Sequence, residues 1–70
     1  SIVRFTKDWL NGATRQGSIK RGQRFQINRF DERNFYIRRV NQDGSIDKKS
    51  YERKWSRTPF HGLLEFAEIE

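Results

Sequence analysis

The sequence of this 70-residue chain predicts an all-β fold, a small closed or half-closed barrel of five short strands with a short helical turn before the last strand. The strongest observation is segment 24–40, in which two runs of alternating apolar and polar residues flank a polar turn. Turn signals, above all Asp43-Gly44, separate further short apolar runs. A chain of this length is expected to form one domain, 1–70, with a thin core.

The first predicted elements are a strand and a long loop. Ile2–Phe5 consists largely of strand-forming residues, and we expect it to be an edge strand. Residues 6–21 contain several turn signals, including Asn11-Gly12, which indicate a long irregular loop or a loose hairpin. Trp9 and Leu10 are the expected anchors of this loop, with Trp9 folded back over the core.

The central hairpin is interpreted from side-chain parity, because strand residues alternate between faces and cross-strand partners share a face. A five-residue connection, 30–34, or an equivalent bulge pairs Ile27 with Ile37 and Phe25 with Arg39. A shorter connection would place charged side chains in the core. We place Phe35 inward, Phe30 exposed at the loop tip, and Gln26, Asn28, Tyr36 and Arg38 on the outer face, with Val40 at its end.

A second tight turn is predicted at Asp43-Gly44, from which the chain returns as a strand over 45–47. The two hairpins together make a three-stranded meander. A short helical turn is then predicted within 50–58, ended by a proline, because Tyr51 and Trp55 are spaced to stack at i and i+4.

A final strand at 63–70 completes the layout, because three glutamates at a helix C-terminus would oppose the helix macrodipole. The layout resembles the SH3-like small β-barrels: Lys20-Arg-Gly-Gln-Arg-Phe25 is similar to a diverging turn, Asp43-Gly44 to a distal hairpin, and a helical turn precedes the last strand. The acidic tyrosine-containing motif, the paired tryptophans and the Pro-x-x-Tyr segment of proline-binding SH3 domains are not evident. Tyr51 is the one plausible counterpart, so the resemblance does not imply binding of polyproline.

The formal net charge of +6 is unevenly distributed along the chain. The last ten residues contain Glu65, Glu68 and Glu70 but no lysine or arginine. A basic body of this kind favours polyanionic partners such as nucleic acid, anionic membrane surfaces or acidic proteins. We expect the glutamates either to mask part of the basic surface or to pair with that of a neighbour.

Composition also sets expectations for the environment. The chain contains no cysteine, which excludes disulfides and gives no reason to expect an oxidising compartment. No apolar run approaches the length of about 20 residues needed to span a bilayer, and the first residues do not form a signal peptide. We expect a soluble cytoplasmic protein that does not bind a membrane.

The sequence offers little for catalysis or metal binding. His61, the one histidine, has no nucleophile or carboxylate at a spacing that implies a catalytic dyad. Segment 41–47 is similar to part of an EF-hand loop, but Arg39 stands where the first carboxylate ligand belongs. We therefore expect no enzyme activity, no catalytic residues, no cofactor, no metal and no small-molecule substrate.

The function we predict is binding of nucleic acid, DNA or RNA, by a basic hairpin face interleaved with aromatic residues. Guanidinium groups suit phosphates and stack on rings, and Tyr36 or Phe30 would stack on a base. A surface coat of cations that serves solubility is the competing interpretation. The candidate residues, expected to form one cationic strip, are Arg29, Arg33, Tyr36, Arg38, Lys48, Lys49, Arg53 and Arg57.

Two alternatives remain open. The first is a protein-binding adaptor or inhibitor, of the kind encoded by phages or plasmids, that binds an acidic partner through Trp9, Phe30 and Tyr36 or through the edge of Ile2–Phe5. The second is an aromatic cage for a methylated cation, which needs the rings of Phe30, Phe35 and Tyr36 to converge.

Overall fold

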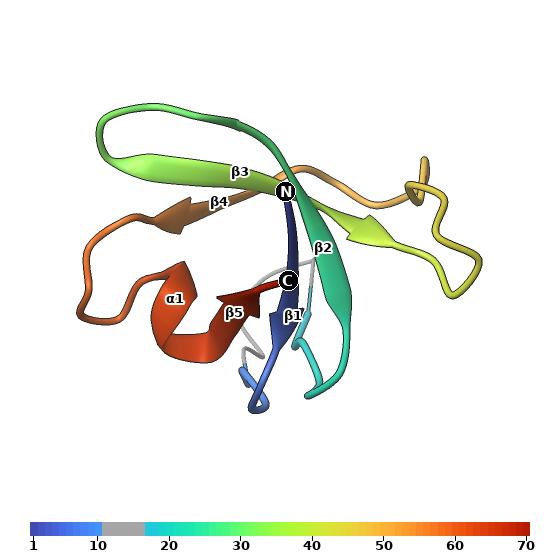
Figure 1. The fold of residues 1–70 in the computed structure, drawn as a ribbon, viewed down its shortest axis with the longest axis horizontal. Helices are drawn as coiled ribbons and strands as arrows, with labels where there is room; N and C mark the ends of the chain where they lie inside the picture. The colour runs from blue at the N-terminus through green and yellow to red at the C-terminus, as the bar shows by residue number, and fades with distance from the viewer. Residues whose placement is uncertain (11–16) are drawn as a thin grey trace.

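The computed structural model describes residues 1–10 and 17–70. In chain order, its elements are β1 (Ile2–Phe5), β2 (Arg24–Phe30), β3 (Asn34–Val40), β4 (Arg53–Ser56), α1 (Leu63–Phe66) and β5 (Ala67–Ile69). The five strands form one antiparallel sheet in the order β4-β3-β2-β1-β5, which curls into a half-barrel (Figure 1). The fold is mostly β, with a short helix before the last strand, as the sequence predicts.

The central hairpin has the predicted pairing. Ile27 lies opposite Ile37, and Phe25 lies opposite Arg39. The register is set by a bulge between Ile27 and Arg29, which lets β2 continue to Phe30. The equivalent bulge, rather than the five-residue connection, therefore keeps the apolar residues on one face.

The core lies on the concave face of the curled sheet, which we call the inner face; the opposite side is the outer face. Trp55 is at its centre, with ring centroids 4.9 Å from Trp9 and 5.6 Å from both Phe5 and Phe66. Full burial of a large apolar side chain stabilises a fold by about 1.5–3 kcal/mol, so this short list carries much of the stability. The core residues are Val3, Phe5, Ile19, Phe25, Ile37, Trp55, Leu63 and Ala67.

β1 is an interior strand, so the prediction of an edge strand was wrong. Val3 pairs with Phe25 of β2 on one side and with Ile69 of β5 on the other. The strand alternation fixes which face is buried, but it does not reveal that the distant C-terminal strand returns to lie beside β1. The backbone amide of Glu70 donates to the carbonyl of Ile2 (2.8 Å), and the two ends of the chain lie close together. The edges of the sheet are β4 and β5.

The segment predicted to be helical contains β4, which is a correction. Trp55 pairs with Phe35 and points inward, whereas Lys54 pairs with Tyr36 on the outer face. Positions four apart share a face of a strand as well as of a helix, so the spacing of Tyr51 and Trp55 did not discriminate between them. The helical turn is α1, with Leu63 fully buried, and it takes the first half of the predicted final strand. Within residues 1–10 and 17–70, no helix has the length and apolar content to span a bilayer.

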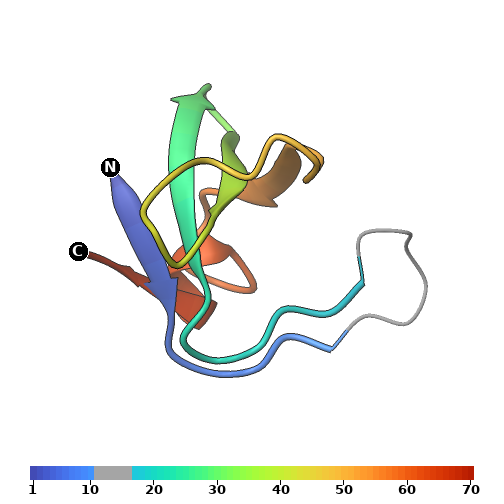
Figure 2. The same cartoon turned by 90° about the vertical axis from the view of Figure 1, so that its right-hand side faces the viewer.

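The long first loop is a hairpin in its described parts, since its two arms run side by side (Figure 2). Trp9 and Ile19 each donate a backbone hydrogen bond to the other, both 2.8 Å long. Trp9 packs on the core as predicted, whereas Leu10 is 81% exposed and does not anchor the loop. Ile19, fully buried, is the second anchor. The Asn11-Gly12 turn signal lies outside the described residues.

The turn after β3 forms where Asp43-Gly44 predicts it. Gly44 has a φ of +90°, and its amide donates to the carbonyl of Asn41 (3.0 Å). The returning strand predicted at 45–47 is reduced to a single bridge between Val40 and Ile46, which is a correction. The carboxylate of Asp43 accepts hydrogen bonds from both the amide (2.9 Å) and the hydroxyl (2.6 Å) of Ser45, so local side-chain bonds take the place of a ladder.

Candidate nucleic-acid interface

The structure divides the predicted cationic strip between two faces. Tyr36 and Arg38 lie on the outer face, opposite Lys54 and Gln26. Arg53 pairs with Ile37 and therefore lies on the inner face, at the rim of the core. The residues predicted to form one strip therefore form separate clusters. Arg29 belongs to the outer face, Arg57 follows the inner-face alternation beyond β4, Arg33 is in the hairpin loop, and Lys48 and Lys49 are in the turn that follows Asp47.

Three arginines of the outer face are engaged by carboxylates, whereas Arg38 is in no ion pair among the residues that the structure describes. Arg29 contacts Glu52 at 3.0 Å, and its guanidinium also lies 3.9 Å from the centre of the Tyr36 ring. Hydrogen bonds from Asn28 and Arg29 hold the pKa of Glu52 below its usual value. Two of the C-terminal glutamates act in the same way on neighbouring strands. The bridges are Arg4–Glu68 (3.1 Å) and Arg24–Glu70 (2.7 Å). The acidic end thus neutralises part of the basic surface, though not the predicted strip.

Both the hydroxyl and the ring of Tyr36 interact with other residues of the protein. Its hydroxyl donates to Asp31 (2.8 Å), and the Asp31 carboxylate also accepts from the amides of Arg33 and Asn34. The two backbone bonds and the tyrosine bond lower the pKa of Asp31, and the same tyrosine bond raises the pKa of Tyr36. With Arg29 on its ring, Tyr36 shapes the hairpin loop rather than offering an open stacking face.

At the hairpin tip, Phe30 is exposed as predicted, at 66%. The Arg57 guanidinium lies 5.2 Å from the Phe30 ring centre and 5.4 Å from that of Phe35, and it donates to the carbonyl of Asp31. Tyr36 lies on the opposite face from Phe35, because neighbouring strand residues alternate. The three rings of the proposed aromatic cage therefore do not converge, and Trp9, a predicted protein-binding residue, packs against Trp55 in the core.

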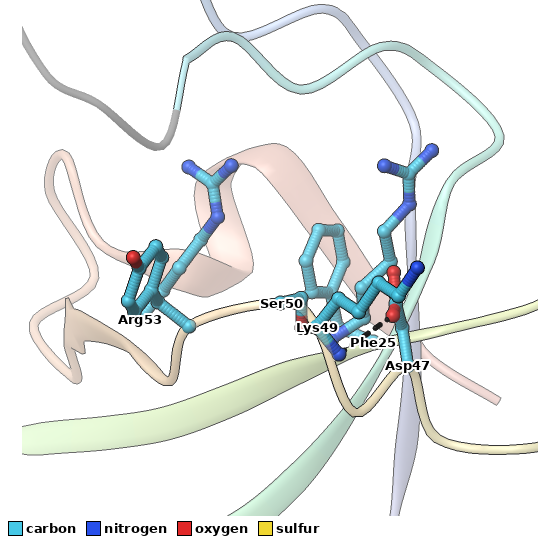
Figure 3. A pocket seen from close by; sticks show the side chains of 7 residues that line it. Phe25, Asp47, Lys49, Ser50 and Arg53 are labelled. Atoms are coloured by element: carbon cyan, nitrogen blue, oxygen red, sulfur yellow. Dashed lines mark hydrogen bonds between the residues drawn. The ribbon is translucent and has the colours of Figure 1, made fainter.

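A pocket of about 260 Å³ lies beside the C-terminal half of β3, on the inner-face side. Arg53 stands on one side of it, and Asp47 and Lys49 stand on the other (Figure 3). Three cationic side chains and one carboxylate therefore face the same small space. The lining residues are Phe25, Arg39, Asp47, Lys49, Ser50, Tyr51 and Arg53.

Backbone hydrogen bonds fix the turn against β3 at this point. The amide of Asp47 donates to the carbonyl of Arg39 (2.8 Å), and the amide of Arg39 donates to the hydroxyl of Ser50 (3.3 Å). The Asp47 carboxylate accepts from the amide of Lys49 (2.9 Å), which folds the turn back on itself. The backbone of Arg39, which lines the pocket, is therefore held by residues from both ends of the turn.

The electrostatics of the pocket favour an anion. Burial lowers the pKa of Arg53, and the positive charge of Arg39 lowers it further. The Arg53 guanidinium donates to the carbonyl of Gly17 (3.1 Å) and lies 6.0 Å from the centre of the Phe25 ring, which orients it. Arg39 has no ion-pair partner among the residues that the structure describes. An anion between two like charges would relieve their repulsion and accept their hydrogen bonds.

A second hollow, of about 670 Å³, continues from the other side of Arg39. It adds Lys20 and Arg21 from the first loop, together with Arg24, which is bridged to Glu70. The amide of Arg21 donates to Asp8 (2.7 Å), so one carboxylate approaches this side as well. We call the combined surface the Arg39 groove. Its cationic and aromatic members are Lys20, Arg21, Arg24, Phe25, Arg39, Lys49, Tyr51 and Arg53.

Sequence reasoning placed Lys49 and Arg53 in the candidate site but omitted Arg39 and Tyr51. Arg39 was predicted to lie opposite Phe25 and therefore on the same face of the hairpin. It does share that face, yet its side chain is exposed at the rim. Tyr51, which was assigned to a helical turn, is 66% exposed beside the pocket. Strand alternation in the sequence predicts the face on which Arg39 lies. No pattern in the sequence predicts the path of residues 47–52, which brings Tyr51 beside the pocket.

The part of the chain that the structure describes contains no cluster of metal-ligating side chains. No three histidine, cysteine, aspartate or glutamate residues gather there to hold a metal ion. His61 is almost fully exposed, and its Nδ1 lies 3.5 Å from the carboxylate of Glu65. No protein-family model matches the chain, and no curated protein or solved structure matches it either.

Proposed function

We propose that this chain is a nucleic-acid-binding module, not an enzyme, and that it binds phosphates in the Arg39 groove. We also propose that its scaffold is of the SH3-like kind. The strand order and the long first loop between β1 and β2 support this, because they agree with the layout that the sequence resembles. The proposed partner is the one that the sequence predicts, but the proposed contact surface is the rim of the inner face rather than the outer face of the hairpin.

The observation that carries the proposal is the juxtaposition of Arg39 and Arg53. Because Arg53 pairs with Ile37, it is the diagonal neighbour of Arg39 on the same face of the sheet. Diagonal neighbours on two paired strands are typically about 7–8 Å apart. Guanidinium forks match the oxygens of a phosphate, and two forks that line one pocket match it better than scattered surface cations. Lys20, Arg21 and Lys49 extend the positive potential along the groove.

The test is fluorescence anisotropy of labelled single-stranded DNA, duplex DNA and RNA, from about 50 to 200 mM salt, where phosphate-driven binding is most visible. The variant is the double replacement Arg39→Gln with Arg53→Gln. The matched control is Arg4→Gln with Arg29→Gln, which removes the same charge from the outer face at two residues that do not line the groove. Thermal unfolding of both proteins checks that they remain folded.

We expect the groove variant to lose about tenfold or more in affinity at about 100 mM salt, as charge-assisted bonds are lost. The slope of log affinity against log salt should fall by about 0.7 per lost phosphate contact on a single strand, or about 0.9 on a duplex. The control should change affinity much less. Equal losses in the two variants would show that only net charge matters and would contradict the groove.

One observation favours the alternative of an acidic protein partner. Phe30 borders an apolar hollow of about 430 Å³, which is also lined by Ile27, Phe35 and Ile69. Arg57 lies on the Phe30 ring and would complement a carboxylate. A pull-down after nuclease treatment discriminates between the two functions. A stoichiometric protein whose capture is lost on Phe30→Ser would support the alternative.

A further inference from the structure

We infer that the Arg39 groove binds single-stranded rather than duplex nucleic acid, with one phosphate between Arg39 and Arg53 and one unpaired base stacked on Tyr51. This inference rests on the proposed function and specifies its ligand. It follows from the arrangement of the aromatic rings as much as from that of the charges.

Tyr51 is the available ring beside the phosphate pocket. Its side chain is 66% exposed and lines the same pocket as Arg39 and Arg53. The other candidate rings are engaged elsewhere. Tyr36 carries Arg29 on its face, and Trp9 packs on Trp55. A large exposed aromatic side chain beside a positively charged groove is the combination that single-strand binding sites use.

The positions of Phe25 and Arg53 explain why a base would stack on Tyr51 rather than on Phe25. The Phe25 ring is buried, and the Arg53 guanidinium lies 6.0 Å from its centre, so this ring supports the arginine rather than a ligand. Tyr51 stands in the chain two residues before Arg53, just outside β4. A nucleotide whose phosphate sits between the arginines would therefore have its base directed to the exposed ring.

The geometry discriminates against a duplex because paired bases are stacked on each other and their faces are closed to a side chain. A duplex offers this groove its phosphates alone, without the stacking contact. An unpaired strand offers both, and stacking on an aromatic side chain tolerates any base. We therefore expect a preference for single strands with little sequence selectivity.

The experiment compares three labelled 12-nucleotide ligands by anisotropy at about 100 mM salt: oligothymidylate, a matched duplex, and a single strand whose central positions are abasic. The variants are Tyr51→Leu, Tyr51→Phe and Arg39→Gln. Phe60→Leu is the matched control, because Phe60 is 79% exposed and is not among the groove residues. Since Tyr51 and Phe60 are both exposed, neither change should unfold the protein.

Tyr51→Leu should weaken binding to oligothymidylate by about tenfold with an unchanged salt slope, the loss expected for one stacked base. Tyr51→Phe and Phe60→Leu should bind as the natural chain does. The abasic strand and the duplex should bind more weakly and should not respond to Tyr51→Leu. An upfield shift of the Tyr51 ring resonances on titration with oligothymidylate gives a second readout.

Failure of the inference and failure of the proposed function give different results. If Arg39→Gln weakens binding but Tyr51→Leu does not, or if the duplex binds at least as tightly as the single strand, the groove binds phosphates alone and the inference is overturned. If no ligand binds, or if Arg39→Gln has no effect, the proposed function fails and the inference fails with it.

Discussion

The two faces of the sheet carry arginines in opposite circumstances. On the outer face, Arg4, Arg24 and Arg29 each contact a glutamate within 3.1 Å. At the rim of the inner face, Arg39 and Arg53 border one pocket, where burial and the positive charge of Arg39 lower the pKa of Arg53. The same residue type is thus largely neutralised by carboxylates on one face and leaves positive potential available on the other.

This difference shows that net charge is a poor guide to the position of a binding site. The +6 of the chain is a sum over paired and unpaired groups. Exposed ion pairs contribute little to stability, but they remove cations from the surface that a polyanion meets. The pairing pattern, which depends on the return of the C-terminal strand to β1, therefore decides which cations are available.

The largest expected effect is a difference in stability between substitutions on the two faces of one strand, β4. Trp55→Ala removes an inner-face ring that contacts Phe5, Trp9 and Phe66, and should lower the free energy of unfolding by about 3–5 kcal/mol. Lys54→Ala, one residue earlier and on the outer face, should change it by less than about 0.5 kcal/mol. Urea denaturation monitored by circular dichroism measures both. Similar losses in the two variants would contradict the assignment of faces in β4.

The hairpin of β2 and β3 shows how much of the fold was predictable. Its alternation specified the pairing of Ile27 with Ile37, because a slip by one residue would have moved the whole apolar set to solvent. β4 was not predictable, since Tyr51 and Trp55 satisfy a helix and a strand equally. The position of β1 inside the sheet depended on a contact with β5, more than 60 residues away in the chain, for which local pattern holds no information.

The candidate site was predictable only in part, for a related reason. Parity placed Arg39 and Phe25 together, and composition indicated a polyanionic partner. The placement of Arg39 and Arg53 beside one pocket requires that β4 be a strand, because Arg53 reaches the inner face through its pairing with Ile37. An error in secondary structure at one short segment thus displaced the predicted site from the inner-face rim to the outer face.

The second effect tests how the inner face is closed by α1. A Cβ added at Gly62 would lie 2.1 Å from the carbonyl oxygen of Thr58 and 2.7 Å from that of Ser56, both backbone atoms. Gly62→Ala should therefore displace α1 and the buried Leu63, at a cost of about 1–3 kcal/mol. Gly44→Ala is the control: its positive φ strains an alanine, but the space is open, so we expect about 1 kcal/mol. Thermal denaturation of the two variants shows which one loses more stability. A smaller loss for Gly62→Ala than for Gly44→Ala would contradict the close approach of the Thr58 and Ser56 carbonyls to Gly62.

The smallest effect concerns the outer face and depends on pH. Hydrogen bonds from Arg24, and its charge, hold the pKa of Glu70 below the ordinary value of 4.5. A carboxylate whose pKa is lowered by folding stabilises the folded state above its unfolded pKa, and this contribution is lost as the pH falls through the folded value. Glu70→Gln should therefore lower the urea midpoint slightly at pH 7, and the difference from the natural chain should shrink by about pH 3.

Glu32→Gln provides the matched control for this titration, because Glu32 is exposed in the hairpin loop and forms no ion pair among the residues that the structure describes. It should leave the midpoint unchanged at both pH values. A Glu70 effect of equal size at pH 7 and pH 3 would mean that its contribution is packing rather than charge. Because Glu70 bridges Arg24 at the border of the Arg39 groove, Glu70→Gln also releases a cation there. The same variant should therefore bind polyanions slightly more tightly, which links the pairing on one face to the potential on the other.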